Sequence, residues 1–469
     1  MTRKAKIVAT IGPASREPRM LRALLEAGMD AARLNLSFGD RSEHAQVIGE
    51  LRRLSTQHER PVAIIADLPG PKIRTGRLEN GKPVVLRTGQ QLTLTAQGIV
   101  GNRERIGITY ARLARDFRPG ARILLDDGSI ELRIRKIQRG DAVCRVVNGG
   151  TLRERKGVNL PHTILQFPSL TAKDKELVRF ALKQGVDYIA QSFVRSAQNV
   201  RDLKQYIRRT GNDTPVVAKI EKPEALDDLE AILDVADGVM IARGDLGVEM
   251  SLEEVPNAQR DIITRANERR IPVITATQML QSMIENPRPT RAEVADVAAA
   301  IVQGSGAVML SAETSVGRYP REAVEMMSKI IRATEAAVPV QRHRQRARNL
   351  SETMAETVAV AAEQYHMTAI AVFTEGGYSA RLVSKARPIP PIVAFSPCPE
   401  VRTRLALLWG VLPRHIERMQ DVDHLIQEGE RCLLQEKLVK KGDIVAFVAG
   451  IPLHVAGNTN LLKFHTIGR

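Results

Sequence analysis

Short runs of apolar and β-branched residues recur along the chain, with amphipathic segments between them. The runs expected to be strands cover residues 6–11, 32–37, 62–68, 188–193, 216–221, 239–244, 273–278 and 308–313. Segments 19–27 and 197–209 have the periodicity of amphipathic helices. Strands that alternate with helices favour a parallel sheet with crossover helices. Eight such units predict an α/β fold, a closed (β/α)8 barrel of the TIM type.

One interval between these runs is too long for a single strand–helix unit. Most run starts are about 20 to 35 residues apart, but 126 residues separate Val62 from Tyr188. Residues 71–167 alternate polar and apolar positions with turns about every ten residues, which is typical of a small antiparallel β domain. The breaks at residues 69–71 and at Pro168 predict hinges. We therefore expect an inserted β-barrel-like domain at 71–167, and the large barrel at 1–70 and 168–338.

The last part of the chain restarts the alternation after a basic stretch at 341–348. Because no aromatic residue interleaves the basic side chains, this stretch favours a solvated linker over a nucleic-acid-binding segment. Strands are expected at 369–373, 392–395, 444–448 and 461–467. This pattern predicts a C-terminal doubly wound α/β domain at 339–469.

Composition narrows the class of protein. The chain has 469 residues, 43% hydrophobic and 26% charged, which are proportions of globular domains. Aromatic residues make up only 3%, so stacking platforms for single-stranded nucleic acid are disfavoured. The net charge of +16 favours an anionic partner, such as a phosphorylated metabolite, a nucleic acid or a membrane surface. A solvated basic surface without a specific partner explains the charge equally well.

Cysteine usage and the N-terminus favour a cytoplasmic protein. Cys144, Cys398 and Cys432 form no CxxC pair and no metal-ligand spacing, so no disulfide framework is expected. The first apolar run is short and ends at the Gly12–Pro13 step, as in a strand and unlike a signal peptide. No run approaches 18 apolar residues, so no membrane span is expected.

Polar residues and one glycine lie where six of the eight predicted strands end. These are Arg33, Asn35, Ser37, Asp67, Lys219, Glu221, Arg243, Gly244, Asp245, Thr275, Thr277, Ser311 and Glu313. Strand carboxyl ends form the working face of such a barrel. Two carboxylates, Glu221 and Asp245, suit Mg²⁺ or Mn²⁺ with substrate oxygens completing the shell. A divalent ion with a lysine and an arginine predicts a phosphoryl-transfer site.

Each of these residues also has a structural interpretation. Hydroxyls such as those of Thr277 and Ser311 often cap helices, and Glu313 is as easily a structural ion-pair partner. Lys219 differs, because it lies in the apolar run 216–221, where a buried cation requires a reason. Glu221 lies two residues after Lys219, so both side chains point to the same side of the predicted strand.

Several motifs resemble those of the pyruvate kinase family. They are KIVATIGPAS (6–15), DDG (126–128), KGVNLP (156–161), AKIE (218–221), ARGDLGVE (242–249), ATQML (276–280), PRPTRAE (287–293) and LSAET (310–314). The resemblance covers nearly the whole chain and implies phosphoryl transfer from phosphoenolpyruvate to ADP, giving pyruvate and ATP. It also implies that the inserted domain is a lid over the barrel mouth, and that the protein is a homotetramer.

The resemblance implies a role for each matching residue. Lys219 would stabilise the phosphoryl group in transfer, and Arg33 would contact its phosphate. Glu221 and Asp245 would hold the divalent ion. Phosphoenolpyruvate would be bound by Gly244, Asp245 and Thr277. The nucleotide would be bound by Asn35, Ser37, Arg74 and Lys156. Proton delivery to the enolate would involve Thr277, Ser311 and Glu313.

Two positions depart from the family pattern. Phe38 stands where many members have His, so it offers no hydrogen bond to a nucleotide. Leu68 and Lys72 stand where potassium-activated members have Thr and Glu, although Asn35, Ser37 and Asp67 match the monovalent-cation ligands. A lysine ammonium carries the charge of K⁺, so we predict activity that is independent of K⁺.

The C-terminal domain resembles the family's regulatory domain. Residues 373–381 form a predicted strand, a Gly-rich turn and a helix start, an arrangement that can cradle a phosphate. Glu375 within this turn opposes phosphate binding, and a plain helix entry is an equal alternative. A phosphorylated allosteric effector is therefore one interpretation of this loop.

Two other functions compete with the kinase interpretation. A Mg²⁺-dependent barrel enzyme acting on a 2-oxo acid, a lyase or aldolase, would share Glu221 and Asp245 but would not need Arg74 and Lys156. A nucleic-acid-binding protein would explain only the basic charge, and the scarcity of aromatic residues argues against it. We expect neither a nucleic-acid nor a membrane partner.

Overall fold

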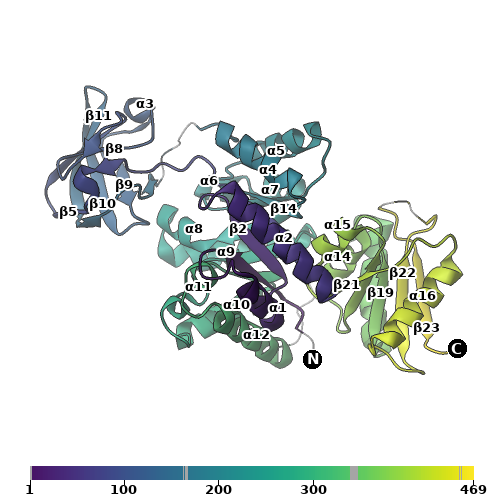
Figure 1. The fold of residues 1–469 in the computed structure, drawn as a ribbon. Helices are drawn as coiled ribbons and strands as arrows, with labels where there is room; N and C mark the ends of the chain where they lie inside the picture. Colours follow the sequence, from purple (N-terminus) through teal and green to yellow (C-terminus); the bar gives the residue numbers. More distant parts are fainter. Residues whose placement is uncertain (1–2, 162, 164–166, 339–346, 454, 456) are drawn as a thin grey trace.

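The structure is a computed structural model that describes residues 3–161, 163, 167–338, 347–453, 455 and 457–469. Three parts follow one another across the molecule (Figure 1). A barrel with its helices forms the centre, a group of short strands lies at one end, and a second α/β unit lies at the other. Residues 341–346 of the predicted basic linker lie outside the described residues.

The central part is a closed barrel of eight parallel strands in the order β1-β18-β17-β16-β15-β14-β3-β2. The strands are β1 (Lys6–Ile11), β2 (Ala31–Asn35), β3 (Ala63–Asp67), β14 (Tyr188–Gln191), β15 (Val216–Ile220), β16 (Gly238–Ala242), β17 (Val273–Ala276) and β18 (Ala307–Leu310). The predicted fold class is confirmed. Several predicted strands end one to three residues later than the observed ones, so Thr277 and Ser311 lie on the rim, beyond the hydrogen-bonded ladder.

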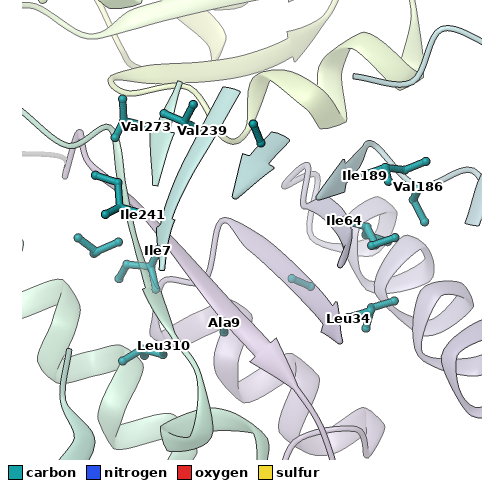
Figure 2. Packing of buried hydrophobic residues seen from close by; sticks show 14 of the residues in the cluster. Ile7, Ala9, Leu34, Ile64, Val186, Ile189, Val239, Ile241, Val273 and Leu310 are labelled. Carbon is teal, nitrogen blue, oxygen red and sulfur yellow. The ribbon is translucent and has the colours of Figure 1, made fainter. Parts of the chain in front are cut away.

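Both faces of the barrel strands are buried, which explains their nearly continuous apolar runs. Val8 of β1 belongs to the cluster that fills the barrel, while its neighbours Ile7 and Ala9 face the surrounding helices. Figure 2 shows part of this outer layer, with Ile7 and Ala9 in it. Ala406 and Leu407, from the C-terminal unit, join the inner cluster. The lumen is therefore a packed core, and chemistry is confined to its rim.

Helices surround the barrel between the strands. They are α1 (Pro18–Ala27), α2 (Arg41–Gln57), α4 (Ala172–Lys183), α5 (Ala197–Arg209), α6 (Pro223–Asp227), α7 (Leu229–Val235), α8 (Arg243–Glu249), α9 (Val255–Glu268), α10 (Arg291–Gln303), α11 (Ala312–Ser315) and α12 (Pro320–Ala337). Their ends follow sequence signals: α10 begins with a capping box of Thr290 and Glu293 and ends at Gly304, in the left-handed conformation.

The insert leaves the barrel after β3 and returns before α4. Its strands are β4 (Arg77–Leu78), β5 (Val84–Leu86), β6 (Gln91–Thr95), β7 (Val100–Gly101), β8 (Arg105–Gly107), β9 (Arg122–Leu125), β10 (Ile130–Gln138), β11 (Asp141–Asn148), β12 (Gly150–Leu152) and β13 (Val158–Asn159), with α3 (Leu113–Asp116). The main sheet, β13-β9-β10-β11-β6-β8, is antiparallel except for its β6–β8 pair. It has a hydrophobic core of its own, centred on residues such as Phe117 and Leu132.

The C-terminal unit has a five-stranded sheet in the order β21-β20-β19-β22-β23. Its elements are α13 (Leu350–Gln364), β19 (Ala369–Phe373), α14 (Tyr378–Lys385), β20 (Ile392–Ser396), α15 (Pro399–Leu405), β21 (Val411–His415), α16 (Val422–Gln435), β22 (Ile444–Ala449) and β23 (Leu461–Thr466). Sequence patterning missed β21 because Pro413 interrupts it. A proline is tolerated there because β21 is an edge strand. In the described residues, no helix combines the length and hydropathy that a membrane span requires.

Candidate active site

Asp67, the last residue of β3, is the centre of a buried ionic network at the carboxyl end of the barrel. Its Oδ2 accepts from the Arg33 guanidinium of β2, with N···O distances of 2.7 Å from Nε and 2.6 Å from Nη2. Its Oδ1 lies 3.2 Å from the Lys219 ammonium of β15 and accepts from the Ser192 hydroxyl at 3.3 Å. Two cations and a hydroxyl therefore converge on one carboxylate.

Lys219 is held by three side chains at the rim. Its Nζ lies 2.7 Å from Glu221 Oε1 and donates to Ser192 Oγ at 2.7 Å, in addition to the Asp67 contact. Its side chain is only 9% exposed, so the ammonium is held almost free of water. The sequence prediction that Lys219 and Glu221 share one side of β15 agrees with this contact.

The electrostatics keep these groups ionised. Burial alone would lower the pKa of Lys219, but the carboxylates of Asp67 and Glu221 outweigh it and raise that pKa above its usual value. Burial would raise the pKa of Asp67, yet Lys219 and Arg33 hold it below its usual value. The site therefore presents a positive charge at Lys219, supported by a negative charge at Asp67.

Glu221 and Asp245 are a pair of carboxylates suited to a divalent ion. Burial, together with the nearby charge of Asp245, raises the pKa of Glu221, although Lys219 opposes this rise. Glu221 Oε2 also accepts from the backbone N–H of Phe193 at 2.9 Å. Among the described residues, no group of three or more His, Cys, Asp or Glu side chains is arranged around a metal site. Two carboxylates, with substrate oxygens and water as further ligands, fit Mg²⁺.

The loop after β17 places a hydroxyl against the start of α8. Thr277 has a φ of +66° and Gln278 a φ of +55°, which are left-handed conformations that a threonine rarely adopts. Thr277 Oγ1 accepts from the backbone N–H of Gly244 at 2.7 Å. Arg243 donates to the carbonyl oxygens of both Thr277 and Gln278, at 2.8 and 3.3 Å, and pairs with Asp296 at 2.6 Å. Arg243 thus stabilises the strained turn.

Ser311 and Glu313 are brought together at the end of β18. Glu313 is fully buried and accepts from the backbone N–H groups of Ser311 and Leu280, at 2.7 and 3.1 Å. The observed contacts of Glu313 are therefore those of a loop-stabilising carboxylate. Ser311 Oγ is buried and has no hydrogen-bond partner in the structure.

The residues assigned to the nucleotide are divided between two places. Arg74 and Lys156 lie on the insert, where Arg74 donates to the carbonyl of Arg155 at 3.1 Å and Lys156 pairs with Asp126 at 2.8 Å. Neither contacts the ionic network of the barrel rim in this arrangement. Lys72 does approach it, because its Nζ lies 3.7 Å from Asp245 Oδ1.

A cavity of about 420 Å³ lies beside this network, at the ends of β1, β2 and β18. Arg33, Asn35 and Phe38 line it, and Phe38 is 66% exposed at this position. Asn35 Oδ1 accepts from the backbone N–H of Ser37 at 3.1 Å, so these two residues shape the turn after β2. Leu68 is buried, and the ammonium of Lys72 lies beside Asp245 rather than beside Asn35, Ser37 or Asp67.

Sequence reasoning missed three contributors to this site. Ser192 and the backbone of Phe193 follow β14 and contact Lys219 and Glu221, and Thr10 accepts from Arg33 at 3.1 Å. Ser192 could have been found from the sequence, because it is the last polar residue of the predicted strand 188–193 and lies at the same rim. The contribution of Phe193 is its backbone N–H, which every residue except proline has. The residue type therefore does not predict this contact, and only the fold shows it.

Comparison with known proteins identifies a common family. The model described as pyruvate kinase, barrel domain, matches residues 2–324, and that described as pyruvate kinase, alpha/beta domain, matches residues 352–465. The chain is 44% identical over 472 residues to a pyruvate kinase of Mycobacterium tuberculosis, covering 100% of this chain and 99% of the relative. It is 42% identical over 475 residues to that of Geobacillus stearothermophilus, covering 100% and 81%. A pyruvate kinase structure from Cryptosporidium parvum superposes with a TM-score of 0.90 at 35% identity, covering 99% of this chain and 96% of the other.

Proposed function

This chain belongs to the pyruvate kinase family, and from that premise we propose how its barrel rim performs the family reaction. The enzyme is a phosphotransferase of glycolysis that transfers the phosphoryl group of phosphoenolpyruvate to ADP. The observation that carries the assignment of its site is the buried Lys219 ammonium, held on Asp67 and Glu221 at the end of β15.

Lys219 and Arg33 stabilise the phosphoryl group in transfer. A loose phosphoryl-transfer transition state spreads negative charge over its peripheral oxygens, so fixed cations lower its free energy more than covalent help would. Both cations are already oriented by Asp67, so little reorganisation accompanies the reaction. This geometry supports a direct contact of Lys219 with the transferring group.

Glu221 and Asp245 would hold the Mg²⁺ or Mn²⁺ ion of the site. The bound ion would neutralise charge on the phosphate and enolate oxygens. Gly244 and Asp245, in the first turn of α8, would orient the substrate carboxylate together with Thr277, whose Oγ1 accepts from the Gly244 N–H. Ser311, whose hydroxyl has no partner in the structure, and Thr277 are our candidates for relaying a proton toward the enolate carbon. Glu313 positions Ser311 through its backbone N–H.

The nucleotide occupies the cavity beside Arg33, Asn35 and Phe38, with Ser37 shaping its edge. A volume of about 420 Å³ matches the size of small-molecule sites. The insert, residues 71–167, acts as a lid that brings Arg74 and Lys156 to the nucleotide phosphates and excludes water from the reaction. The barrel at 1–70 and 168–338 is the catalytic domain.

Lys72 replaces the activating K⁺ of other members. Its ammonium lies beside Asp245, and Asp67 is already paired with Lys219 and Arg33, so the negative charges near the predicted cation site are compensated by side chains. Leu68 adds no oxygen ligand to that site. We therefore expect full activity with Mg²⁺ alone.

The C-terminal domain, residues 339–469, is the regulatory domain of a cytoplasmic homotetramer. A cavity of about 60 Å³ lies at its Gly-rich turn and is lined by Glu375 and Arg418, which form an ion pair at 3.2 Å. An anionic effector at this turn would have to displace Glu375 from Arg418. Sedimentation of the protein with and without a sugar phosphate or a nucleoside monophosphate tests the assembly and the effector together.

The experiment that tests the function is pyruvate formation from phosphoenolpyruvate with Mg²⁺, with and without ADP, in the absence of K⁺. Pyruvate that forms only with ADP supports the kinase and the role of Lys72. Activity that requires added K⁺ supports the kinase but contradicts the role of Lys72. Pyruvate formation that is indifferent to ADP contradicts the assignment of the lid residues.

A further inference from the structure

The lid is tied to the barrel by a buried carboxylate that no step above uses. Asn159 ends β13 of the lid, and its Nδ2 donates to Glu249 Oε1 at 2.6 Å. The same oxygen accepts from Lys222 Nζ at 2.6 Å. The Glu249 side chain is 3% exposed and that of Lys222 is 13% exposed. These contacts are shielded from water, so loss of one partner is not replaced by solvent.

Glu249 connects the lid to both carboxylates of the divalent-ion site through short pieces of backbone. It is the last residue of α8, and Asp245 lies four residues earlier, on the same face of that helix. Lys222 directly follows Glu221 in the chain. A displacement of Glu249 therefore moves the helix that carries Asp245 and the segment that carries Glu221.

A second path joins the same residues to the hinge of the lid. Lys222 Nζ lies 5.9 Å from the centre of the Phe193 ring, and the Phe193 N–H donates to Glu221 Oε2. The hinge residue Gly70 lies against Phe193, since a Cβ at Gly70 would be 2.8 Å from Phe193 Cδ2. Both sets of contacts, through Asn159 and Glu249 and through Gly70 and Phe193, thus lead from the lid to Glu221.

We propose that Glu249 is a positioning residue that couples the lid to the divalent-ion site. With Asn159 attached, α8 and the Glu221–Lys222 segment are held in the arrangement that presents two carboxylates to one ion. Binding of the ion and attachment of the lid therefore favour each other, because a coupling between two sites acts equally in both directions. This inference rests on the assignment of Glu221 and Asp245 to the ion.

The test measures binding of Mn²⁺ alone to the full chain, from the paramagnetic resonance signal of the free ion. Asn159→Leu removes the donor at nearly constant volume, and Glu249→Gln keeps the acceptor oxygen but removes its charge. We expect each to weaken Mn²⁺ binding by about fivefold or more, although neither residue contacts the ion. The double variant should be no weaker than the worse single one, because the two residues act as one unit.

Amide hydrogen exchange distinguishes a loss of coupling from a general loss of stability. Mn²⁺ should slow amide exchange in the connecting segments 68–76 and 155–160 of the wild-type chain, but not in Asn159→Leu. Glu131→Gln, which removes an ion pair with Arg122 on the lid surface, is the matched control and should behave as wild type. Thermal unfolding confirms that each variant is folded.

Two results overturn the proposal: unchanged Mn²⁺ affinity in both single variants, or Mn²⁺-dependent protection that persists in Asn159→Leu. Glu221→Gln separates this failure from a failure of the ion site itself. If Glu221→Gln also leaves Mn²⁺ affinity unchanged, the assignment of the ion ligands is wrong. If Glu221→Gln abolishes binding while Asn159→Leu does not change it, only the coupling is wrong.

Discussion

At the scale of single residues, the site depends on charges whose partners fix them in place. Lys219 is buried, yet it remains charged because Asp67 and Glu221 compensate the loss of hydration. The same contacts orient its Nζ, so this charge needs no rearrangement to act on a substrate. Removal of one partner leaves a buried charge with less compensation, so single substitutions here should have large effects.

Lys219→Met should reduce kcat by about 10²- to 10³-fold or more, the cost of losing a preorganised donor to a developing negative charge. Steady-state assay of pyruvate formation measures the loss. Thermal unfolding of the variant controls for Glu221, which loses its cation, and for Asp67, which keeps only the Arg33 cation. Near-normal turnover would contradict the role of Lys219.

Lys72→Glu should make the enzyme require K⁺. Without the ammonium beside Asp245, activity in K⁺-free buffer should fall by about tenfold, or about 1.4 kcal/mol of transition-state stabilisation, and added K⁺ should restore it. Lys82→Glu makes the same charge change on the exposed surface of the lid and should need no K⁺. A wild-type rate that itself rises tenfold with K⁺, at fixed ionic strength, would contradict the proposal.

At the scale of elements, the short connections between strands and the lid determine the geometry of the site. Gly70 has a φ of +62° at the hinge after β3, and Phe193 has a φ of +58° after β14. The two residues are in contact, and Phe193 donates to Glu221. The predicted hinge and the proposed ion ligand Glu221 are thus connected through Phe193, although about 150 residues of sequence separate them.

Gly70→Ala should lower kcat by about 10- to 100-fold, because the added Cβ displaces Phe193 and Ser192 from Glu221 and Lys219. Gly185→Ala is the matched control, since Gly185 has a φ of +65° but no atom near its potential Cβ. Both variants should lose about 1 kcal/mol of stability from backbone strain, while only Gly70→Ala should lose activity. Equal activities, measured at saturating substrate, would contradict this account.

At the scale of the whole molecule, buried cations lie where the barrel meets the C-terminal domain. Lys6 of β1 donates to the carbonyl of Val411 in β21 at 2.7 Å, across this interface. Burial lowers the pKa of Lys6 to about 8, against the opposing charge of Asp30. The interface therefore contains a group that titrates within an accessible pH range.

The stability contributed by Lys6 should rise with pH. In the unfolded chain a lysine keeps its proton up to a pH of about 10.4, whereas folded Lys6 releases it near pH 8. Between these values the unfolded state binds more protons, so the free energy of unfolding increases with pH, by about 2 to 3 kcal/mol over the window. Below about pH 8 this contribution is absent.

The difference in Tm between wild type and Lys6→Met, measured from about pH 7.5 to about pH 10, isolates this effect. The Tm of wild type should increase relative to that of Lys6→Met as the pH rises through this range. Lys463→Met, on the exposed face of β23, should follow wild type at every pH. A wild-type Tm that falls relative to Lys6→Met would reverse the predicted sign.

The sequence by itself determined the fold class and predicted where the candidate site lies. Hydrophobic periodicity predicted the eight barrel strands, because strands buried on both faces need continuous apolar runs, and the strand ends predicted Lys219, Glu221 and Asp67 on one rim. Only the tertiary structure decided which groups touch. The Phe193 N–H on Glu221, the Lys72 ammonium beside Asp245 and the contact of Asn159 with Glu249 join segments far apart in the chain. Such contacts depend on the direction of the backbone and on how distant segments are placed beside one another in the fold. Neither of these produces a periodic pattern of residue types in the sequence.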